Sequence, residues 1–255
     1  MKKVTLPKEK IHVGMLQLIN ALYPLECENE EELVPVNPDF PNVLINCKVA
    51  KVLQLVYKTI SSGSEIVPVS GYRSFEEQTT IYNDSLKENG EIFTKKFVAL
   101  PGRSEHQTGL AIDLALNKEN IDFICPDFPY DGICEVFRQT AYDYGFIERY
   151  PKGKENITGI SHEPWHFRYI GYPHSKIIKQ KGITFEEYIA LIKNYNSKYK
   201  MNFTEDSGRE FSIYYVPANS DKTEIQIPED YSYEISGNNI DGFIVTVWRD
   251  NDDEK

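Results

Sequence analysis

The sequence lacks any long apolar segment, and it is poor in histidine, with five residues, and in cysteine, with four. No stretch approaches the ~20 apolar residues that a membrane span needs. Residues 1–10 carry the charges of a signal peptide but not its apolar run of ~7–15 residues. We therefore expect a cytoplasmic protein with no membrane anchor.

Basic charge is also scarce, because 28 basic residues stand against 39 acidic ones and give a net charge of -11. This balance argues against a nucleic-acid partner or an anionic membrane, since both require a basic surface. The cysteines do not form the CxxC pairs of a structural zinc site. Without a secretory signal we expect all of them to be reduced thiols, namely Cys27, Cys47, Cys125 and Cys134.

The apolar periodicities predict an α+β fold, and 255 residues are enough to bury a substantial core. Capping boxes that begin at Ser74 and Thr184, and stop signals at Gly90 and Gly145, mark the helix ends. With apolar residues at helical spacing, they predict helices at 43–61, 74–87, 136–144 and 184–195. Runs rich in β-branched and aromatic residues predict strands at 65–69, 109–114, 146–150 and 165–170.

One predicted strand has a clear alternation. Leu110, Ile112 and Leu114 would point to one side of residues 109–114, and Asp113 to the other. The strand would therefore bury three aliphatic side chains and present one carboxylate.

The amino-acid composition of the sequence changes after Lys200. Residues 201–255 hold no histidine or cysteine and contain β-rich runs at 211–216, 224–227 and 243–248. We expect residues 1–200 to form one domain and residues 201–255 a small β appendage, either a hairpin or a three-stranded sheet. The last residues, 251–255, are expected to form a frayed tail.

Two short segments supply the residues of a zinc hydrolase. They are Ser104-Glu105-His106 with the nearby Asp113, and Glu163-Pro164-Trp165-His166. We predict His106, Asp113 and His166 to be ligands, since catalytic zinc sites use three protein ligands and leave one position for a water. Glu163 would stay uncoordinated and act as the base.

Residues 162–166 also match the HExxH pattern of zinc proteases, which places both histidines on one face of a helix. Pro164 fits only the first turn of a helix, which would leave His162 outside. The sequence after Pro164 alternates as a strand does. We therefore predict a strand, with His162 beside the site. His12 and His174 have no such neighbours, and we interpret them as structural.

Three blocks resemble, in order and spacing, the signatures of the zinc D,D-peptidases of the VanY type. They are Ser70-Gly71-Tyr72-Arg73-Ser74, Ser104-Glu105-His106-Gln107-Thr108-Gly109-Leu110-Ala111-Ile112-Asp113 and Glu163-Pro164-Trp165-His166. The resemblance covers roughly residues 30–180. It implies a hedgehog/D,D-peptidase-like fold, in which an antiparallel sheet presents the metal and helices pack on its other side.

The resemblance also implies roles for single residues. Arg73 matches an arginine that stabilises the developing oxyanion, and the alternative role for it is an ordinary salt bridge in the turn. Gln78 and Ser104 match positions that help hold the substrate. Trp165 would wall the pocket unless it belongs to the core. His106, Asp113, His166 and Glu163 match the family's ligands and base.

The implied activity is hydrolysis of D-Ala-D-Ala bonds with one zinc ion per chain. A cytoplasmic member is similar to the VanXY enzymes, which cleave both free D-Ala-D-Ala and the UDP-linked muramyl pentapeptide and so remove the target of vancomycin. The β-rich residues 201–255 make the VanG-associated VanXY type the most similar. Loops at 84–102 and 116–130 would decide the balance of the two activities.

Other interpretations remain open at this point. The chain could have only one of the two activities, or it could be an L,D-carboxypeptidase acting on tetrapeptides. It could also be a zinc-binding module without catalysis, which the presence of Glu163 argues against. A homodimer is compatible with the sequence.

Overall fold

The structure is a computed structural model that describes residues 1–27 and 32–249. Its contacts divide the chain into two compact units, which are described separately. The first consists of Ile19–Thr184, and the second joins Met1–Leu18 to Phe185–Lys255.

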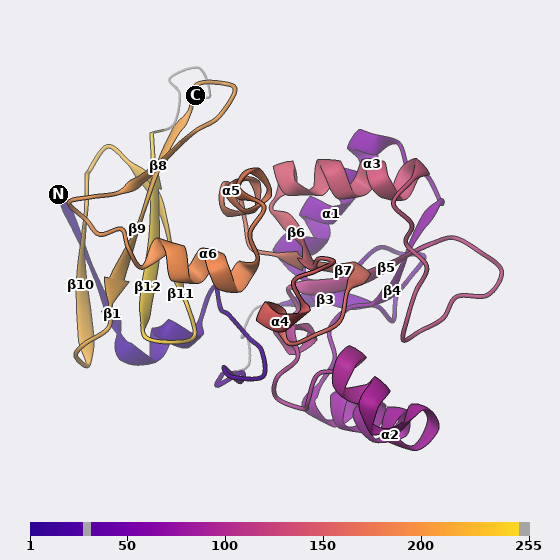
Figure 1. The fold of residues 1–255 in the computed structure, drawn as a ribbon. Helices are drawn as coiled ribbons and strands as arrows, with labels where there is room; N and C mark the ends of the chain where they lie inside the picture. The colour runs from indigo at the N-terminus through magenta and orange to yellow at the C-terminus, as the bar shows by residue number, and fades with distance from the viewer. Residues whose placement is uncertain (28–31, 250–255) are drawn as a thin grey trace. The chain divides into compact units, whose positions relative to one another are not determined.

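The unit Ile19–Thr184 is built on a four-stranded antiparallel sheet with strand order β4-β5-β7-β6 (Figure 1). A two-stranded ribbon of β2 and β3 precedes it. The elements are β2 (Leu33–Pro35), β3 (Leu44–Asn46), α1 (Cys47–Ile60), β4 (Ile66–Ser70), α2 (Phe75–Phe97), η2 (Glu105–Thr108), β5 (Ala111–Leu116), α3 (Gly132–Ala141), η3 (Tyr142–Tyr144), β6 (Phe146–Tyr150), α4 (Glu155–Thr158), β7 (Glu163–Tyr169) and α5 (His174–Lys181).

The alternation of β5 and β7 separates an apolar face from a polar one. Ile112 lies opposite Phe167 and Asp113 lies opposite His166, so the two pairs point to opposite sides of the sheet. On the apolar side the Phe167 ring packs edge-on against Phe137 of α3, at a centroid distance of 5.0 Å. Helix α3, with α1 packed against it, therefore covers the apolar face, whereas the polar side chains lie on the other face, where Ile81 and Phe97 of α2 line the pocket.

All four predicted helices differ from the observed ones at their ends, and two of these differences have a clear physical cause. The predicted helix 43–61 begins only at Cys47, because residues 44–46 pair with β2 and the side chain of Asn46 caps the first turn. The Ser74 capping box is confirmed, but α2 does not stop at Gly90. That glycine adopts a φ of 80°, and the chain then resumes helical structure as far as Phe97.

The second unit is an all-antiparallel β structure with one short helix. It contains β1 (Lys2–Pro7), η1 (Lys8–His12), α6 (Phe185–Ile192), β8 (Met201–Thr204), β9 (Glu210–Pro217), β10 (Lys222–Ile227), β11 (Ser232–Gly237) and β12 (Gly242–Trp248). A four-stranded sheet has the order β11-β12-β9-β8, and β1 pairs with β10 in a separate ribbon. The C-terminal β structure is therefore larger than the expected hairpin or three-stranded sheet.

Strand β1 joins this unit although it lies at the other end of the sequence. Lys2 is opposite Ile227 and Pro7 is opposite Lys222. Ile225 and Ile227 belong to the core of this unit, together with Ile11 from the N-terminal segment. The structure thus groups the first 18 residues with the C-terminal strands, a pairing that leaves no local signal in the sequence. The predicted tail at 251–255 lies outside the described residues.

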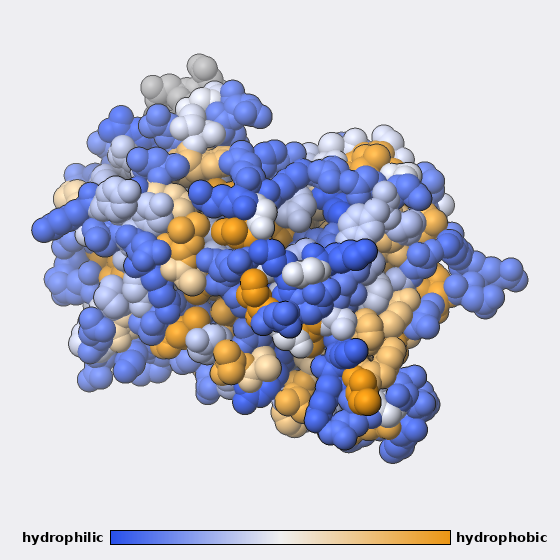
Figure 2. All heavy atoms as spheres, viewed as in Figure 1, coloured by the Kyte–Doolittle hydropathy of each residue, from blue (hydrophilic) through white to orange (hydrophobic). Residues whose placement is uncertain are grey.

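Within the described ranges, no helix has both the length and the apolar character needed to cross a bilayer. The face of the molecule in Figure 2 is mostly hydrophilic, with apolar residues in scattered patches. All four cysteines are free thiols, as predicted.

Candidate active site

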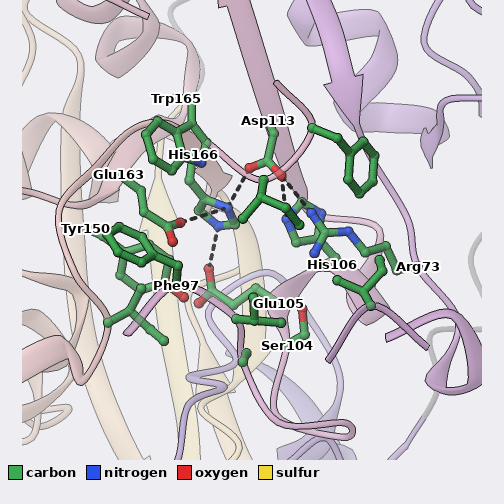
Figure 3. A pocket seen from close by; sticks show the side chains of 16 residues that line it. Arg73, Phe97, Ser104, Glu105, His106, Asp113, Tyr150, Glu163, Trp165 and His166 are labelled. Atoms are coloured by element: carbon green, nitrogen blue, oxygen red, sulfur yellow. Dashed lines mark hydrogen bonds and ion pairs between the residues drawn. The ribbon is translucent and has the colours of Figure 1, made fainter. Parts of the chain in front are cut away.

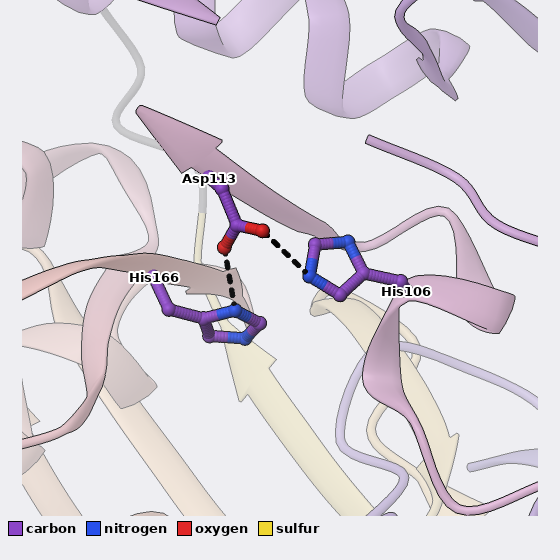
Figure 4. Close-up of side chains that lie close together, drawn as sticks. All are labelled: His106, Asp113 and His166. Carbon is purple, nitrogen blue, oxygen red and sulfur yellow. Dashed lines mark hydrogen bonds and ion pairs between the residues drawn. The ribbon is translucent and has the colours of Figure 1, made fainter. Parts of the chain in front are cut away.

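The three predicted metal ligands converge on the polar face of the sheet (Figure 4). Asp113 and His166 are cross-strand partners on β5 and β7, and His106 reaches them from η2. Asp113 Oδ1 lies 2.8 Å from His166 Nδ1, and Asp113 Oδ2 lies 3.2 Å from His106 Nε2. One potential ligand atom from each residue lies within 4.8 Å of the other two, and all three residues are buried.

The two histidines present different ring nitrogens to Asp113. His106 donates from Nδ1 to the carbonyl oxygen of Gly71 at 2.6 Å, which leaves Nε2 for the shared position. His166 instead turns Nδ1 toward Asp113. Burial, reinforced by the charge of Arg73, lowers the pKa of His106 to about 4, so this ring is neutral as a ligand must be.

The carboxylate between the two rings has strong electrostatic effects. Burial opposes its charge, but the contacts with both histidines hold the pKa of Asp113 well below its usual value. Burial likewise opposes the charge of His166, yet Asp113 outweighs it and raises the pKa of His166 to about 9. Two imidazoles and one carboxylate at this spacing fit a zinc ion. Bound zinc would replace the extra proton of His166 with its own positive charge.

Arg73 lies beside the cluster because β4 ends at Ser70, directly opposite Asp113. Its Nη2 donates to Asp113 Oδ2 at 2.7 Å, and its Nε donates to Ser70 Oγ at 2.8 Å. Gln78 accepts a longer bond from Arg73 Nη1 at 3.4 Å. Contacts on several sides therefore hold the arginine beside the cluster of His106, Asp113 and His166. These contacts reach beyond the salt bridge within the turn that was the alternative role for Arg73.

Glu163, the predicted base, enters the site from the start of β7. Its Oε2 lies 3.9 Å from His166 Nδ1, too far for a hydrogen bond but adjacent to the ligand cluster. Burial, opposed by the charge of His166 and reinforced by that of Asp113, raises the pKa of Glu163 to about 8. A carboxyl group with such a pKa binds and releases a proton near neutral pH.

The remaining predicted residues occupy different depths (Figure 3). Ser104 and Trp165 line the pocket of the cluster, and both are buried. Gln78 is fully buried and donates to the carbonyl oxygen of Ala99 at 2.8 Å. It thus borders the site through Arg73 rather than lining the pocket.

His162 is outside the cluster, as the strand interpretation requires. β7 begins at Glu163, so residues 162–166 do not form a helix. The Nε2 of His162 lies 2.6 Å from the hydroxyl of Tyr130, and the two rings stack. The helical HExxH arrangement is therefore absent.

Glu105 is a buried acid of the site for which the sequence reasoning proposed no role. Burial disfavours its charge, but Arg149 and Arg168 outweigh this effect and lower the pKa of Glu105 below its ordinary value. The only sequence signal was its position next to His106 in the motif. Its two arginine partners come from β6 and β7 and could not be paired with it from the sequence.

A four-stranded antiparallel sheet with α1 and α3 on one face and a buried His–Asp–His cluster on the other defines a metallopeptidase of the D,D-peptidase fold. Residues 43–172 match the family VanY, D-alanyl-D-alanine carboxypeptidase. The chain belongs to this family, and the predicted family and fold class are confirmed.

Individual relatives agree with this assignment. The chain is 47% identical to the bifunctional D-Ala-D-Ala dipeptidase and carboxypeptidase VanXYC of Enterococcus gallinarum, over 69% of this chain and 94% of the relative. The crystal structure of the vancomycin resistance D,D-dipeptidase VanXYg, in complex with a D-Ala-D-Ala phosphinate analog, is 61% identical. The match covers 97% of this chain and 99% of the VanXYg chain, with a TM-score of 0.96.

A more distant structure bears on the metal. A mutant of the D,D-pentapeptidase VanY from the VanB-type resistance cassette, in complex with Zn(II), is 29% identical over 69% of this chain and 98% of that chain, with a TM-score of 0.58. The metal in that related protein is thus zinc. The likeness to VanXYg extends over nearly the whole chain and therefore includes the β-rich C-terminal strands.

Proposed function

We propose that this chain is a zinc-dependent D,D-peptidase that releases D-Ala from both free D-Ala-D-Ala and the muramyl pentapeptide precursor. The observation that carries the proposal is the buried cluster of His106, Asp113 and His166, with Glu163 and Arg73 beside it. The likeness to VanXYg over nearly the whole chain supports the dipeptide as substrate.

The three clustered side chains would hold one zinc ion per chain. When bound, zinc supplies a Lewis acid that polarises the scissile carbonyl and lowers the pKa of a water molecule. The lowered pKa of His106 and the anionic Asp113 suit this role, because ligands must be free of competing protons.

Glu163 performs the proton transfers. Its carboxylate removes the proton of the attacking water and then delivers it to the leaving amine of the terminal D-Ala. Burial near the cluster prepares Glu163 for both steps, because its raised pKa makes it a stronger base than an exposed carboxylate.

Arg73 stabilises negative charge that develops on the carbonyl oxygen. A guanidinium keeps its charge at any working pH, and its fixed donors require no reorganisation during the reaction. Ser70, Gln78 and Asp113 hold the group in place at the pocket wall.

Room beside the pocket supports the longer substrate. A cavity of about 360 Å³ shares Val98, Ala99, Tyr150 and Ile160 with the pocket of the cluster. We place the part of the pentapeptide that precedes D-Ala-D-Ala in this side cavity, whose wall includes Leu100. Because both substrates are precursors of cell-wall synthesis, we assign the enzyme to the cytoplasm, where their hydrolysis would give vancomycin resistance.

The test is D-Ala release from D-Ala-D-Ala, from the muramyl pentapeptide and from a tetrapeptide, with zinc content measured in the same samples. We expect turnover of the first two substrates. Activity on the pentapeptide alone would remove the dual function, and preference for the tetrapeptide would indicate an L,D-carboxypeptidase. Zinc binding without turnover of any of them would indicate a binding module.

A further inference from the structure

Glu105 is a completely buried carboxylate at the back of the metal cluster. Its side chain has 0% exposure, as do those of Arg149 and Arg168. Arg149 Nε lies 2.9 Å from Glu105 Oε1, and Arg168 Nη1 lies 2.8 Å from the same oxygen. A buried charge is costly unless it is paired, and here two guanidinium groups fix one oxygen of the carboxylate.

The other oxygen of this carboxylate is directed at a metal ligand. Glu105 Oε2 lies 3.7 Å from His166 Nε2, longer than a hydrogen bond but within ion-pair distance (Figure 3). Both atoms are buried, and neither has a hydrogen-bond partner among the described residues. Two buried polar atoms that face each other without other partners call for an explanation, because leaving a buried donor or acceptor unsatisfied is costly.

The ring orientation of His166 supplies that explanation. Its Nδ1 faces Asp113 at 2.8 Å and is the nitrogen available to the metal. A neutral ring that ligates through Nδ1 carries its proton on Nε2, and that N–H would point at Glu105 Oε2. His106 has the mirror arrangement, in which Nδ1 donates to the Gly71 carbonyl and Nε2 faces the cluster.

We propose that Glu105 is the positioning residue of the metal site, which accepts the Nε2–H of His166 and so fixes the tautomer and ring orientation of this ligand. Arg149 and Arg168 hold the carboxylate in place through its other oxygen. Arg168 and His166 are two residues apart on β7 and lie on the same face of the strand. The sheet therefore fixes the position of His166 relative to the arginine that holds Glu105. An acceptor behind a metal-bound histidine raises the basicity of the ligand and typically contributes 10–100-fold to metal affinity, about the range expected here.

This inference rests on the proposed zinc site, and one titration separates the two claims. Metal-free protein is titrated with zinc against a competing chelator at constant pH, for the wild type, H166A and the variants E105Q and E105D. E105Q keeps the shape but removes the negative charge between the arginines. E105D keeps the charge, which protects the fold, but withdraws the carboxylate from His166 by one methylene.

We expect both Glu105 variants to bind zinc about 10–100-fold more weakly than the wild type, and H166A to lose more, because it removes a ligand. The cobalt-substituted protein should show a shifted visible spectrum in E105D, since the His166 ring is no longer held. S85A is the matched control: it removes the buried hydrogen bond from Ser85 to Thr94, 2.8 Å long, in the α2 region. Thermal unfolding of the metal-free proteins identifies folded samples.

S85A should keep wild-type zinc affinity and cobalt spectrum whatever its stability. Wild-type affinity and spectrum in folded E105D would overturn the positioning role and leave the zinc site intact. A wild-type protein that binds no zinc, or H166A with unchanged affinity, would overturn the proposed site and the inference together. If E105Q does not fold, E105D decides the matter alone.

Discussion

Replacing Glu163 by glutamine should change the pH dependence of stability in the metal-free protein. The folded state keeps a proton on Glu163 up to about pH 8, whereas the unfolded chain loses it near the ordinary pKa of 4.5. The corresponding stability is therefore fully present below pH 4.5 and is lost as the pH rises through 8. Glutamine does not titrate, so E163Q should not show this loss.

The size of the effect follows from the shift. The pKa of Glu163, which is 5% exposed, changes from 4.5 to about 8 on folding. At about 1.4 kcal/mol per pH unit, the free energy of unfolding can fall by at most about 5 kcal/mol over this pH range. His166 adds a loss of the same sign between pH 6.5 and about 9 in both proteins. The difference between wild type and E163Q therefore reports the glutamate together with its electrostatic coupling to His166.

The assay is urea unfolding of EDTA-treated protein at a series of pH values. E163Q should gain stability relative to the wild type as the pH rises from 4.5 to about 8. The control E210Q replaces an exposed glutamate of the second unit and should not reproduce this gain. A difference between E163Q and the wild type that stays constant over this pH range would refute the reasoning.

The same variant tests catalysis. E163Q should retain zinc, because Glu163 is not among the ligands, and should lose about 10²–10⁴-fold in kcat, the usual contribution of a general base. Zinc content and D-Ala release are measured on one preparation. Full activity of E163Q would contradict the assigned base.

Five further variants, one of them a control, test the rest of the site and the core. R73K should keep zinc but lower kcat by about 10²–10³-fold, because it removes donors aimed at the oxyanion; an unchanged kcat would leave Arg73 a structural role. L100W should fill the side cavity and reduce kcat/KM for the pentapeptide but not for D-Ala-D-Ala, whereas T80W, in a cavity on another side of the pocket, should spare both; equal effects on the two substrates would place the peptide elsewhere. H162A should retain zinc, and loss of the metal would reinstate this histidine as a ligand. F137A should lower the free energy of unfolding by about 3–5 kcal/mol in urea, because Phe137 is fully buried; a cost below ~1 kcal/mol would contradict tight packing.

Much of the site could be predicted because its chemistry is concentrated in short segments. The alternation around Asp113 placed the carboxylate on one face of a strand, and the strand register of the structure adds that Asp113 lies opposite His166. Pro164 excluded a helix, and β7 indeed begins at Glu163. These inferences depend on local periodicity and on the geometry of proline, which act within a few residues.

The predictions failed where distant segments decide the structure. Asn46 ends a strand rather than continuing a helix, because residues 44–46 hydrogen-bond to β2. Strand β1 belongs with β10, more than two hundred residues away in the sequence, and its alternation alone names no partner. Such pairings depend on which backbone groups meet in space, and composition does not encode this locally.

The sequence by itself determined the identity of the candidate ligands, the base and the strand that carries them, because spacing and proline chemistry are local. Only the tertiary structure decided which buried side chains contact these residues. It placed Glu105 between Arg149 and Arg168 and aimed its second oxygen at His166, and it turned different nitrogens of the two histidines toward Asp113. A charge can be buried there only because three segments, η2, β6 and β7, bring it and its compensating groups to one point, and this convergence is a property of the packed sheet.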